Sequence, residues 1–190
     1  MLKAIKISII LLVIVSVWQF AFTYLITGVA QVAMPNQANG SLIYVDGKVV
    51  GSELIGQSFT SPGYFHGRPS ALDYEGDESA ASNLGPTSAK LMAEVKQRVE
   101  QVRLENGLAA DAPIPADLVT ESASGLDPDI SPDSARLQIG RVAKSRGLAE
   151  SAVKTLVEQQ VEPPQFGVLG AEKVNVLKLN LALDQLAKGK

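Results

Sequence analysis

The chain has 190 residues, of which 20 are acidic and 17 basic, with a single histidine and no cysteine. This length allows one modest soluble domain plus an anchor, and the lack of cysteine excludes disulfides, thiolate nucleophiles and Cys-ligated zinc. Residues 1–45 hold no carboxylate and only two lysines, so the rest of the chain is acidic. Nucleic acid is disfavoured as a partner, because affinity for it comes largely from basic groups that release phosphate counterions.

The first predicted element is a membrane-spanning helix. Ile7–Gly28 is a run of 22 residues without a charge. At about 1.5 Å per residue a helix of this length spans roughly 33 Å, which matches a hydrocarbon core of about 30 Å. The alternative is a cleaved signal peptide that ends near Gly28-Val29-Ala30. Because such peptides have apolar stretches of only about 7–15 residues, an uncleaved anchor is the preferred interpretation.

The charges around this helix predict its direction. Lys3 and Lys6 flank its N-terminal end, and the next charge is Asp46. Cytoplasmic flanks carry the excess of lysine and arginine. We therefore expect residues 1–6 in the cytoplasm, a helix over 7–28 in the inner membrane, and a soluble periplasmic domain over 34–190.

The soluble part begins with a predicted β-hairpin. Residues 41–45 and 48–50 are β-formers joined by Asp46-Gly47, and Asp-Gly is a favoured two-residue turn. Residues 56–86 are rich in Gly, Ser and Pro without any period, which indicates a long loop. Loops of this length in compact domains are usually functional or disordered, and the aromatic residues in this one argue against disorder.

About three helices follow the loop. The first is predicted to be capped by Thr87-Ser88, to bury a stripe of Leu91, Val95, Val99 and Val102, and to end at Asn106-Gly107. The second begins at Ser131-Pro132-Asp133, with serine as the cap and proline at the first helical position.

The second helix is expected to bury Ala135, Ile139, Val142 and Ala143 and to stop at Gly147. A third, with Val153, Leu156, Val157 and Val161 inward, closes at Pro163-Pro164. Residues 174–183 have leucines two apart, which predicts a strand that becomes helical near Asp184. The fold class predicted is α+β.

Two segments resemble catalytic or metal-binding sites but lack residues that such sites need. His66 is the only histidine, so a Ser-His-Asp triad would have to include it, and no nucleophile elbow is present. The acids of residues 127–133 resemble a calcium loop, but Pro132 and Gln138 stand where that loop needs glycine and glutamate. Turn formation and helix capping explain the acids better. A membrane-anchored periplasmic enzyme with a pocket around His66 remains the alternative function.

Residues 141–153 have the pattern of small residues, a glycine turn and a second helix that is typical of a helix-turn-helix. The acidic domain and the predicted periplasmic location both disfavour DNA binding. The sequence also lacks a P-loop and a Gly-x-Gly-x-x-Gly fingerprint, so no phosphate-binding loop can be assigned.

Seven short strings occur in one order after the single anchor. Together they closely resemble the C subunit of the Kdp-type potassium-transporting ATPase of bacteria, and the resemblance covers the whole chain. The strings lie at residues 37–42, 56–59, 64–71, 82–86, 122–127, 141–143 and 174–184. One departure is visible at residues 79–83, where the family tends to have two glycines and this chain has Ala80-Ala81.

This resemblance implies a non-catalytic accessory subunit of a high-affinity, ATP-driven potassium importer. The implied partners are a channel-like potassium-binding subunit, a P-type ATPase subunit and a small membrane peptide. The family is described as a catalytic chaperone that raises the affinity of the pump for ATP. By resemblance, Gln138 is the residue proposed to help, with ATP a cofactor only of the complex. If Lys3 and Lys6 are cytoplasmic, that effect must be allosteric.

The expected partner contact is the aromatic loop Tyr64–Ala71, with Asn83 as a further candidate. Aromatic residues and arginine dominate interface hot spots, which directs attention to Tyr64, Phe65 and Arg68. The alternative is that this loop only packs against its own domain.

Overall fold

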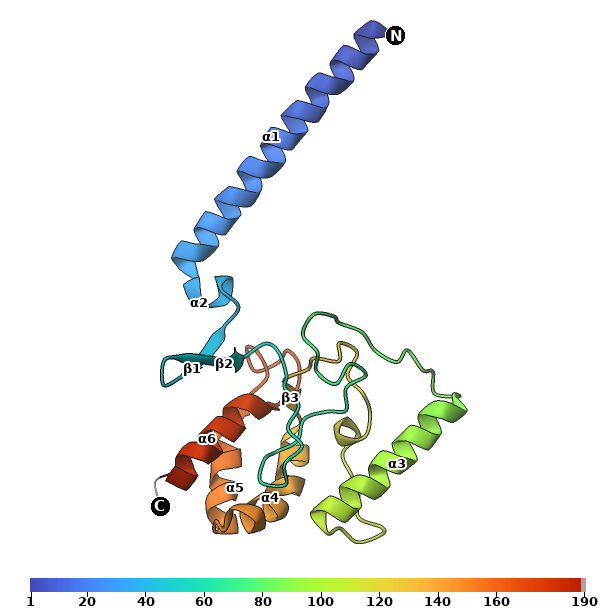
Figure 1. The fold of residues 1–190 in the computed structure, drawn as a ribbon, viewed down its shortest axis with the longest axis vertical. Coiled ribbons are helices and arrows are strands. Elements are labelled where there is room, and N and C mark those ends of the chain that lie inside the picture. Colours follow the sequence, from blue (N-terminus) through green and yellow to red (C-terminus); the bar gives the residue numbers. More distant parts are fainter. Residues whose placement is uncertain (189–190) are drawn as a thin grey trace. The chain divides into compact units, whose positions relative to one another are not determined.

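The computed structural model of the chain describes residues 1–188 (Figure 1). It divides into two compact units, one over Met1–Val50 and the other from Gly51 onward. Each unit is described by itself.

The first unit contains the long apolar helix. Helix α1 covers Leu2–Ala33, has no buried residue, and reaches a mean hydropathy of 2.3. Among residues 1–188 it is the one helix long and apolar enough to cross a membrane. It extends beyond the expected 7–28 at both ends and stops before Pro35, which disfavours helical geometry at the preceding residue. Pro35 then begins the short helix α2, Pro35–Ala38.

The predicted hairpin is present. Strand β1, Leu42–Val45, pairs with β2, Lys48–Ser52. The two turn residues between them, Asp46 and Gly47, have φ of 50° and 75°. Both values are positive, as a hairpin turn of type I′ requires, and Asp-Gly adopts them at low cost.

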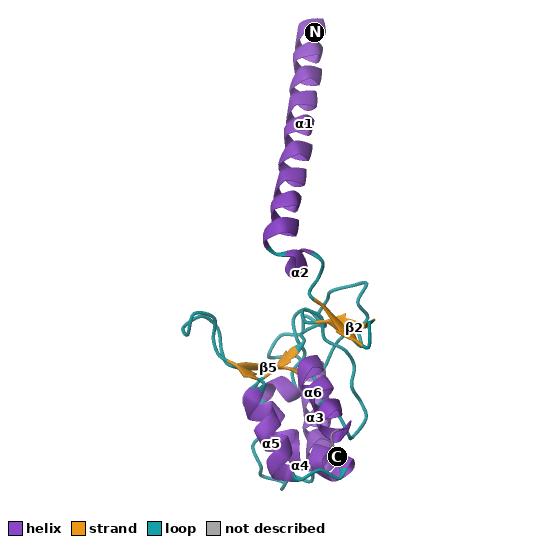
Figure 2. Ribbon diagram, turned by 90° about the vertical axis from the view of Figure 1, so that its left-hand side faces the viewer, coloured by secondary structure: helices purple, strands orange, loops and turns teal. Residues whose placement is uncertain are grey.

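The second unit combines four α-helices with a small sheet (Figure 2). The helices are α3 (Ala89–Asn106), α4 (Pro132–Arg146), α5 (Glu150–Gln159) and α6 (Val176–Lys188). The sheet has the order β3-β5-β4, all antiparallel, from Asp129–Ile130, Lys173–Asn175 and Val161–Glu162. A 3-10 turn, η1, lies at Ala116–Leu118. The α+β prediction is confirmed.

The predicted ends of α3 and α4 are confirmed, whereas α5 ends at Gln159 and Val161 lies in β4 instead of in that helix. Ser88 and Ser131 each accept a hydrogen bond from a first-turn backbone N–H, of Leu91 and Ser134 respectively. Gly107 and Gly147, at the C-terminal ends of α3 and α4, adopt left-handed geometry. These local signals are reliable because capping satisfies backbone groups that have no partner within the helix.

The prediction for the C-terminal segment was wrong in part. The strand β5 ends at Asn175, and α6 begins at Val176 rather than near Asp184. The Asn175 side chain accepts a hydrogen bond from Lys178 N at 3.0 Å and so acts as the helix cap. Leucines two apart suggested a strand, but the buried residues Val176, Leu179, Asn180 and Leu183 follow the helical spacing of three and four.

The core lies between α4, α5, α6 and the sheet. Val142, Val153, Val157, Leu179 and Leu183 have no exposed surface. The remaining members of this buried cluster are Phe65, Ile130, Ala135, Ile139, Ala143, Val174 and Val176. The buried stripe predicted for α4 is therefore confirmed in full.

Helix α3 differs from the other helices of this unit because none of its residues is buried. Its predicted apolar stripe is only half-buried, and Met92 and Leu104 are 60% and 85% exposed. It contacts the rest of the unit mainly through α4. The amphipathic helix was predicted correctly, and its apolar stripe is less buried than those of α4 and α6.

Residues 56–86 form a long loop without helix or strand, as predicted. Phe65 lies within it and is completely buried in the core. The loop is therefore an integral part of the fold.

We expect Phe65→Ala to lower the free energy of unfolding by about 3–5 kcal/mol, because it leaves a cavity in the core. Phe166→Ala is the matched control, since Phe166 is 85% exposed and its truncation should change stability by no more than about 0.5 kcal/mol. Urea unfolding of the full chain in detergent measures both. Equal losses would contradict the assigned core.

Candidate functional site

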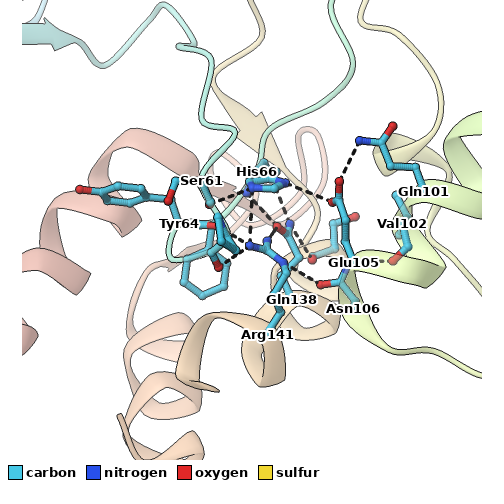
Figure 3. Close-up of polar contacts among 12 residues, drawn as sticks. Ser61, Tyr64, His66, Gln101, Val102, Glu105, Asn106, Gln138 and Arg141 are labelled. Atoms are coloured by element: carbon cyan, nitrogen blue, oxygen red, sulfur yellow. Dashed lines mark hydrogen bonds and ion pairs between the residues drawn. The ribbon is translucent and has the colours of Figure 1, made fainter. Parts of the chain in front are cut away.

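Two amide side chains hold the backbone of the long loop against the helices. Gln138 on α4 accepts a hydrogen bond from His66 N at 2.8 Å and donates one to His66 O at 3.1 Å (Figure 3). Asn180 on α6 makes the same pair of hydrogen bonds with Phe65: it accepts one from Phe65 N at 2.8 Å and donates one to Phe65 O at 3.0 Å. Two successive residues are thus paired by side chains as they would be paired by a neighbouring strand.

The amide of Gln138 uses its whole hydrogen-bonding capacity within the chain. Its Oε1 also accepts from Arg141 Nη2 at 2.6 Å, and its Nε2 also donates to Ser134 O at 3.2 Å. An amide oxygen offers two lone pairs and the nitrogen two protons, so four bonds satisfy the group. Gln138 is only 1% exposed. A ligand could reach it only by displacing these contacts.

Arg141 joins the loop to two helices. From α4 its Nη1 donates to the carbonyls of Pro62 and Tyr64, at 2.7 and 2.9 Å. Its Nε donates to Asn106 Oδ1 at 3.1 Å, at the C-terminal end of α3 (Figure 3). Burial lowers the pKa of the Arg141 guanidinium, and Glu105 opposes that shift. Arg141 is the residue that fixes the position of the loop relative to α3.

His66 is enclosed by groups of its own chain. Its Nε2 lies 3.1 Å from Ser61 O and 3.5 Å from Arg141 Nη1, and its Nδ1 lies 3.5 Å from Glu105 Oε2. Burial, and then the charge of Arg141, lowers the pKa of His66 below 6.5, although the Ser61 carbonyl and Glu105 oppose this. The ring nitrogens face a carbonyl, a cation and a carboxylate, so the geometry offers no serine nucleophile to this histidine.

A cleft of about 360 Å³ lies between the loop and α3. Four of its charged or titratable lining residues are already engaged: Arg68 with Asp127, Arg98 with Glu121, and Glu105 with His66. No group of three or more acidic or histidine side chains within residues 1–188 could hold a metal ion. Other lining residues are Ser58, Phe59, Thr60, Ser70, Asp73, Tyr74, Gln101, Val102, Asn106, Leu118 and Gln138.

The structure brings Tyr64 and Phe65, both predicted as partner contacts, into the fold itself. The Arg146 guanidinium lies 4.3 Å from the centre of the Tyr64 ring, and the Tyr64 hydroxyl donates to Asp184 Oδ2 at 3.1 Å. Phe65 has no exposed surface. These contacts agree with the alternative interpretation, in which the loop packs against its own domain.

Arg68 and Asn83, the other two candidates, lie in different surroundings. Arg68 donates to Asp127 Oδ2 at 2.9 Å and to Glu121 O at 3.2 Å, which ties residues 121–127 to the loop. Asn83 is exposed and donates only locally, to Ala81 O at 3.0 Å. The structure therefore groups Tyr64, Phe65 and Arg68 with Gln138 in one loop-and-helix assembly, and Asn83 is not part of it.

Sequence reasoning did not single out Asn180, Arg141 or Arg146 as site residues. The signal for Asn180 was present, because it is a polar residue in a run of leucines and holds a buried helical position. Arg141 and Arg146 gave no such signal: arginines near a helix C-terminus are usually explained by solvation and by the helix dipole. Their contacts with the loop carbonyls of Pro62 and Gly63 lie more than 70 residues away in the sequence.

Comparison with known proteins identifies relatives over nearly the whole chain. A family model described as "KdpC: K+-transporting ATPase, c chain" matches residues 1–185. The potassium-transporting ATPase KdpC subunit of Gemmatimonas aurantiaca is 57% identical over 166 residues, covering 86% of this chain and 82% of the relative. That of Nitratidesulfovibrio vulgaris is 53% identical over 173 residues, covering 90% and 87%. That of Bradyrhizobium diazoefficiens is 48% identical, covering 98% and 99%.

We expect Gln138→Ala to lower the free energy of unfolding by at least about 2 kcal/mol, because each buried polar group left without a partner costs about 1–3 kcal/mol. Gln101→Ala is the matched control from the same cleft. Gln101 is exposed and bonds Glu105 on its own helix, so a change within about 0.5 kcal/mol is expected. Denaturant unfolding of the full chain decides, and a neutral Gln138→Ala would refute the structural role.

The lowered pKa of His66 predicts a defined pH dependence. Because the unfolded chain binds the proton more readily than the folded one, this group's stability contribution is complete above about pH 6.5 and is lost as pH falls below it. His66→Gln should therefore lose less stability than wild type between about pH 7.5 and 5.5. As His66 is the only histidine, an equal loss in both proteins would contradict the assigned environment.

Proposed function

The chain belongs to the KdpC family of potassium-transporting ATPase subunits, and from this premise we propose that it is a non-catalytic accessory subunit needed for assembly and stability of the import complex. Its partners would be a channel-like potassium-binding subunit, a P-type ATPase subunit and a small membrane peptide. Helix α1 would pack against membrane helices of these partners, and its lack of any buried residue leaves every face available.

The proposed non-catalytic role is supported by the contacts that polar groups of the cleft already make within the chain. Gln138, Arg141 and His66 all hold the loop in place. General acid–base catalysis needs a group within hydrogen-bond reach of a substrate proton. Here Gln138, Arg141 and His66 are engaged with backbone carbonyls, backbone amides and each other, so these three residues act as a structural clamp on the loop.

We propose that ATP acts on the complex and that this chain raises the ATP affinity through coupling between subunits. For Gln138 to bind the nucleotide itself, four hydrogen bonds inside the domain would have to break. A rigid domain can instead stabilise the nucleotide-binding conformation of its neighbour. Such coupling between subunits requires no contact between this chain and the nucleotide. Lys3 and Lys6 on the cytoplasmic side would leave the domain on the periplasmic face of the inner membrane.

The ATP dependence of the complex tests this proposal. The purified full chain in detergent should hydrolyse no ATP, whereas adding it to the other subunits should lower the KM for ATP of the potassium-stimulated ATPase. The Gln101→Ala variant should act as wild type does. ATP hydrolysis by the isolated chain would contradict the accessory role, and a KM that does not respond to the chain would contradict the coupling.

A further inference from the structure

The loop between β4 and β5 carries several exposed apolar side chains and lies apart from Gln138, Arg141 and His66 in the sequence. Its side chains Phe166, Val168 and Leu169 are 85%, 80% and 56% exposed. In Figure 2 the loop next to β5 projects away from the helices. We call residues Gln165–Gly170 the apolar loop. Exposed aromatic and aliphatic side chains gathered at one tip are typical of interaction sites.

The backbone of the apolar loop is closed on itself. Gln165 and Leu169 exchange N–H to C=O hydrogen bonds in both directions at 2.9 Å, and Val168 N donates to Gln165 O at 3.3 Å. Phe166 and Gly167 occupy the turn, with φ of 55° and 75°. The side chains are thus presented by a defined turn, which reduces the entropy lost on binding.

The residue at the first turn position is unexpected. The hairpin β1–β2 uses the same pair of positive φ values and fills them with Asp46 and Gly47, as backbone energetics favour. The apolar loop has Phe166 there, and a bulky residue at positive φ is uncommon and strained. Local folding does not explain a phenylalanine that is both strained and exposed, whereas contact with a partner does.

The base of the loop is fixed to the rest of the domain. Lys178 on α6 bridges Glu162 Oε1 at 3.3 Å, on the strand that leads into the loop, and Glu53 Oε2 at 3.2 Å. Lys173, on the strand that leaves the loop, pairs with Asp129 Oδ2 at 2.7 Å. Glu53 belongs to the same unit, so these ion pairs join the base of the apolar loop to residue 53 and to α6.

The charge of the loop favours a protein over a lipid surface. Residues 161–172 contain two glutamates and no basic residue. Segments that bind membrane surfaces combine apolar side chains with lysine and arginine, which are attracted to anionic lipids. Glu162 is paired with Lys173 and Lys178. The exposed Glu172 would instead be repelled by such a surface, and it would suit a pocket with a basic rim.

We propose that the apolar loop docks this chain onto another subunit of the potassium-transporting complex, by inserting Phe166, Val168 and Leu169 into an apolar pocket with a basic rim. This inference rests on the proposed function, because it takes the partner from the same complex. It places the main contact at residues 165–170 instead of the Tyr64–Ala71 loop, whose side chains hold the fold together. An aromatic residue at the centre of a small apolar patch is the usual composition of an interface hot spot.

The first test is co-purification of the full chain with the other subunits from membranes. The double variant Phe166→Ser/Val168→Ser should recover at least tenfold less of the complex than wild type, with unfolding unchanged. The matched control is Met92→Ser/Leu104→Ser on α3, which removes two exposed apolar side chains, 60% and 85% exposed, and should leave recovery unchanged. Equal recovery for both pairs, or equal loss, would overturn the proposal.

A second test identifies the environment of the loop directly. The chain has no cysteine, so Val168→Cys can carry a single environment-sensitive fluorophore. In nanodiscs of phosphatidylethanolamine and phosphatidylglycerol, the full chain alone should show water-like emission, and its assembly with the other subunits should shift the emission to the blue. A blue shift with lipid alone would assign the loop to the membrane surface. A shift that depends on the concentration of the chain alone would assign it to self-association, and either result would overturn the proposal.

The two proposals fail in different ways. If wild-type chain neither co-purifies with the complex nor changes its KM for ATP, the proposed function fails. If wild type does both and the Phe166→Ser/Val168→Ser variant does both equally well, only the assignment of the apolar loop fails.

Discussion

The soluble unit depends on satisfying the backbone of a loop that enters its core. Phe65 is completely buried, and burying its ring requires the peptide groups of Phe65 and His66 to leave water. Each unpaired buried peptide group would cost as much as a lost hydrogen bond or more. Asn180 and Gln138 supply the missing partners from two helices that the loop brings together. The buried ring of Phe65 and the side-chain amides of Asn180 and Gln138 thus hold this loop in the way that pairing with a neighbouring strand would.

This constraint supports the proposal that Gln138 affects the ATP affinity of the complex without touching nucleotide. Gln138 orients Arg141, which reaches the loop carbonyls and the end of α3. Loss of Gln138 would therefore loosen the loop, α4 and α3 together. In a subunit of a transport complex, that loss of rigidity would weaken whatever conformation the domain stabilises in its neighbours. A lowered affinity of the complex for ATP would then result from looser packing within this domain.

Local signals made most of the elements predictable. Ser88, Ser131, Gly107 and the Asp46-Gly47 turn mark boundaries because each satisfies or permits a particular backbone geometry within a few residues. The start of α6 was missed because alternate leucines fit both a strand and a helix, and only tertiary packing decides between them. The hydrogen bonds from Gln138 and Asn180 to the loop could not be predicted either, because their partners lie 72 and 115 residues away in the sequence. The family resemblance pointed to Gln138 but not to what it binds.

We propose that the domain lies across the membrane from ATP and affects ATP binding by coupling between subunits. A topology experiment on the assembled complex tests this most directly. Leu104 on α3 is 85% exposed, so Leu104→Cys in this cysteine-free chain can be labelled by a membrane-impermeant thiol reagent, with Lys3→Cys as the opposite-side control. The account predicts labelling at 104 once only the outer membrane is opened, and labelling at 3 only after the inner membrane is broken. The reverse pattern would contradict the account and would place Gln138 on the same side as ATP.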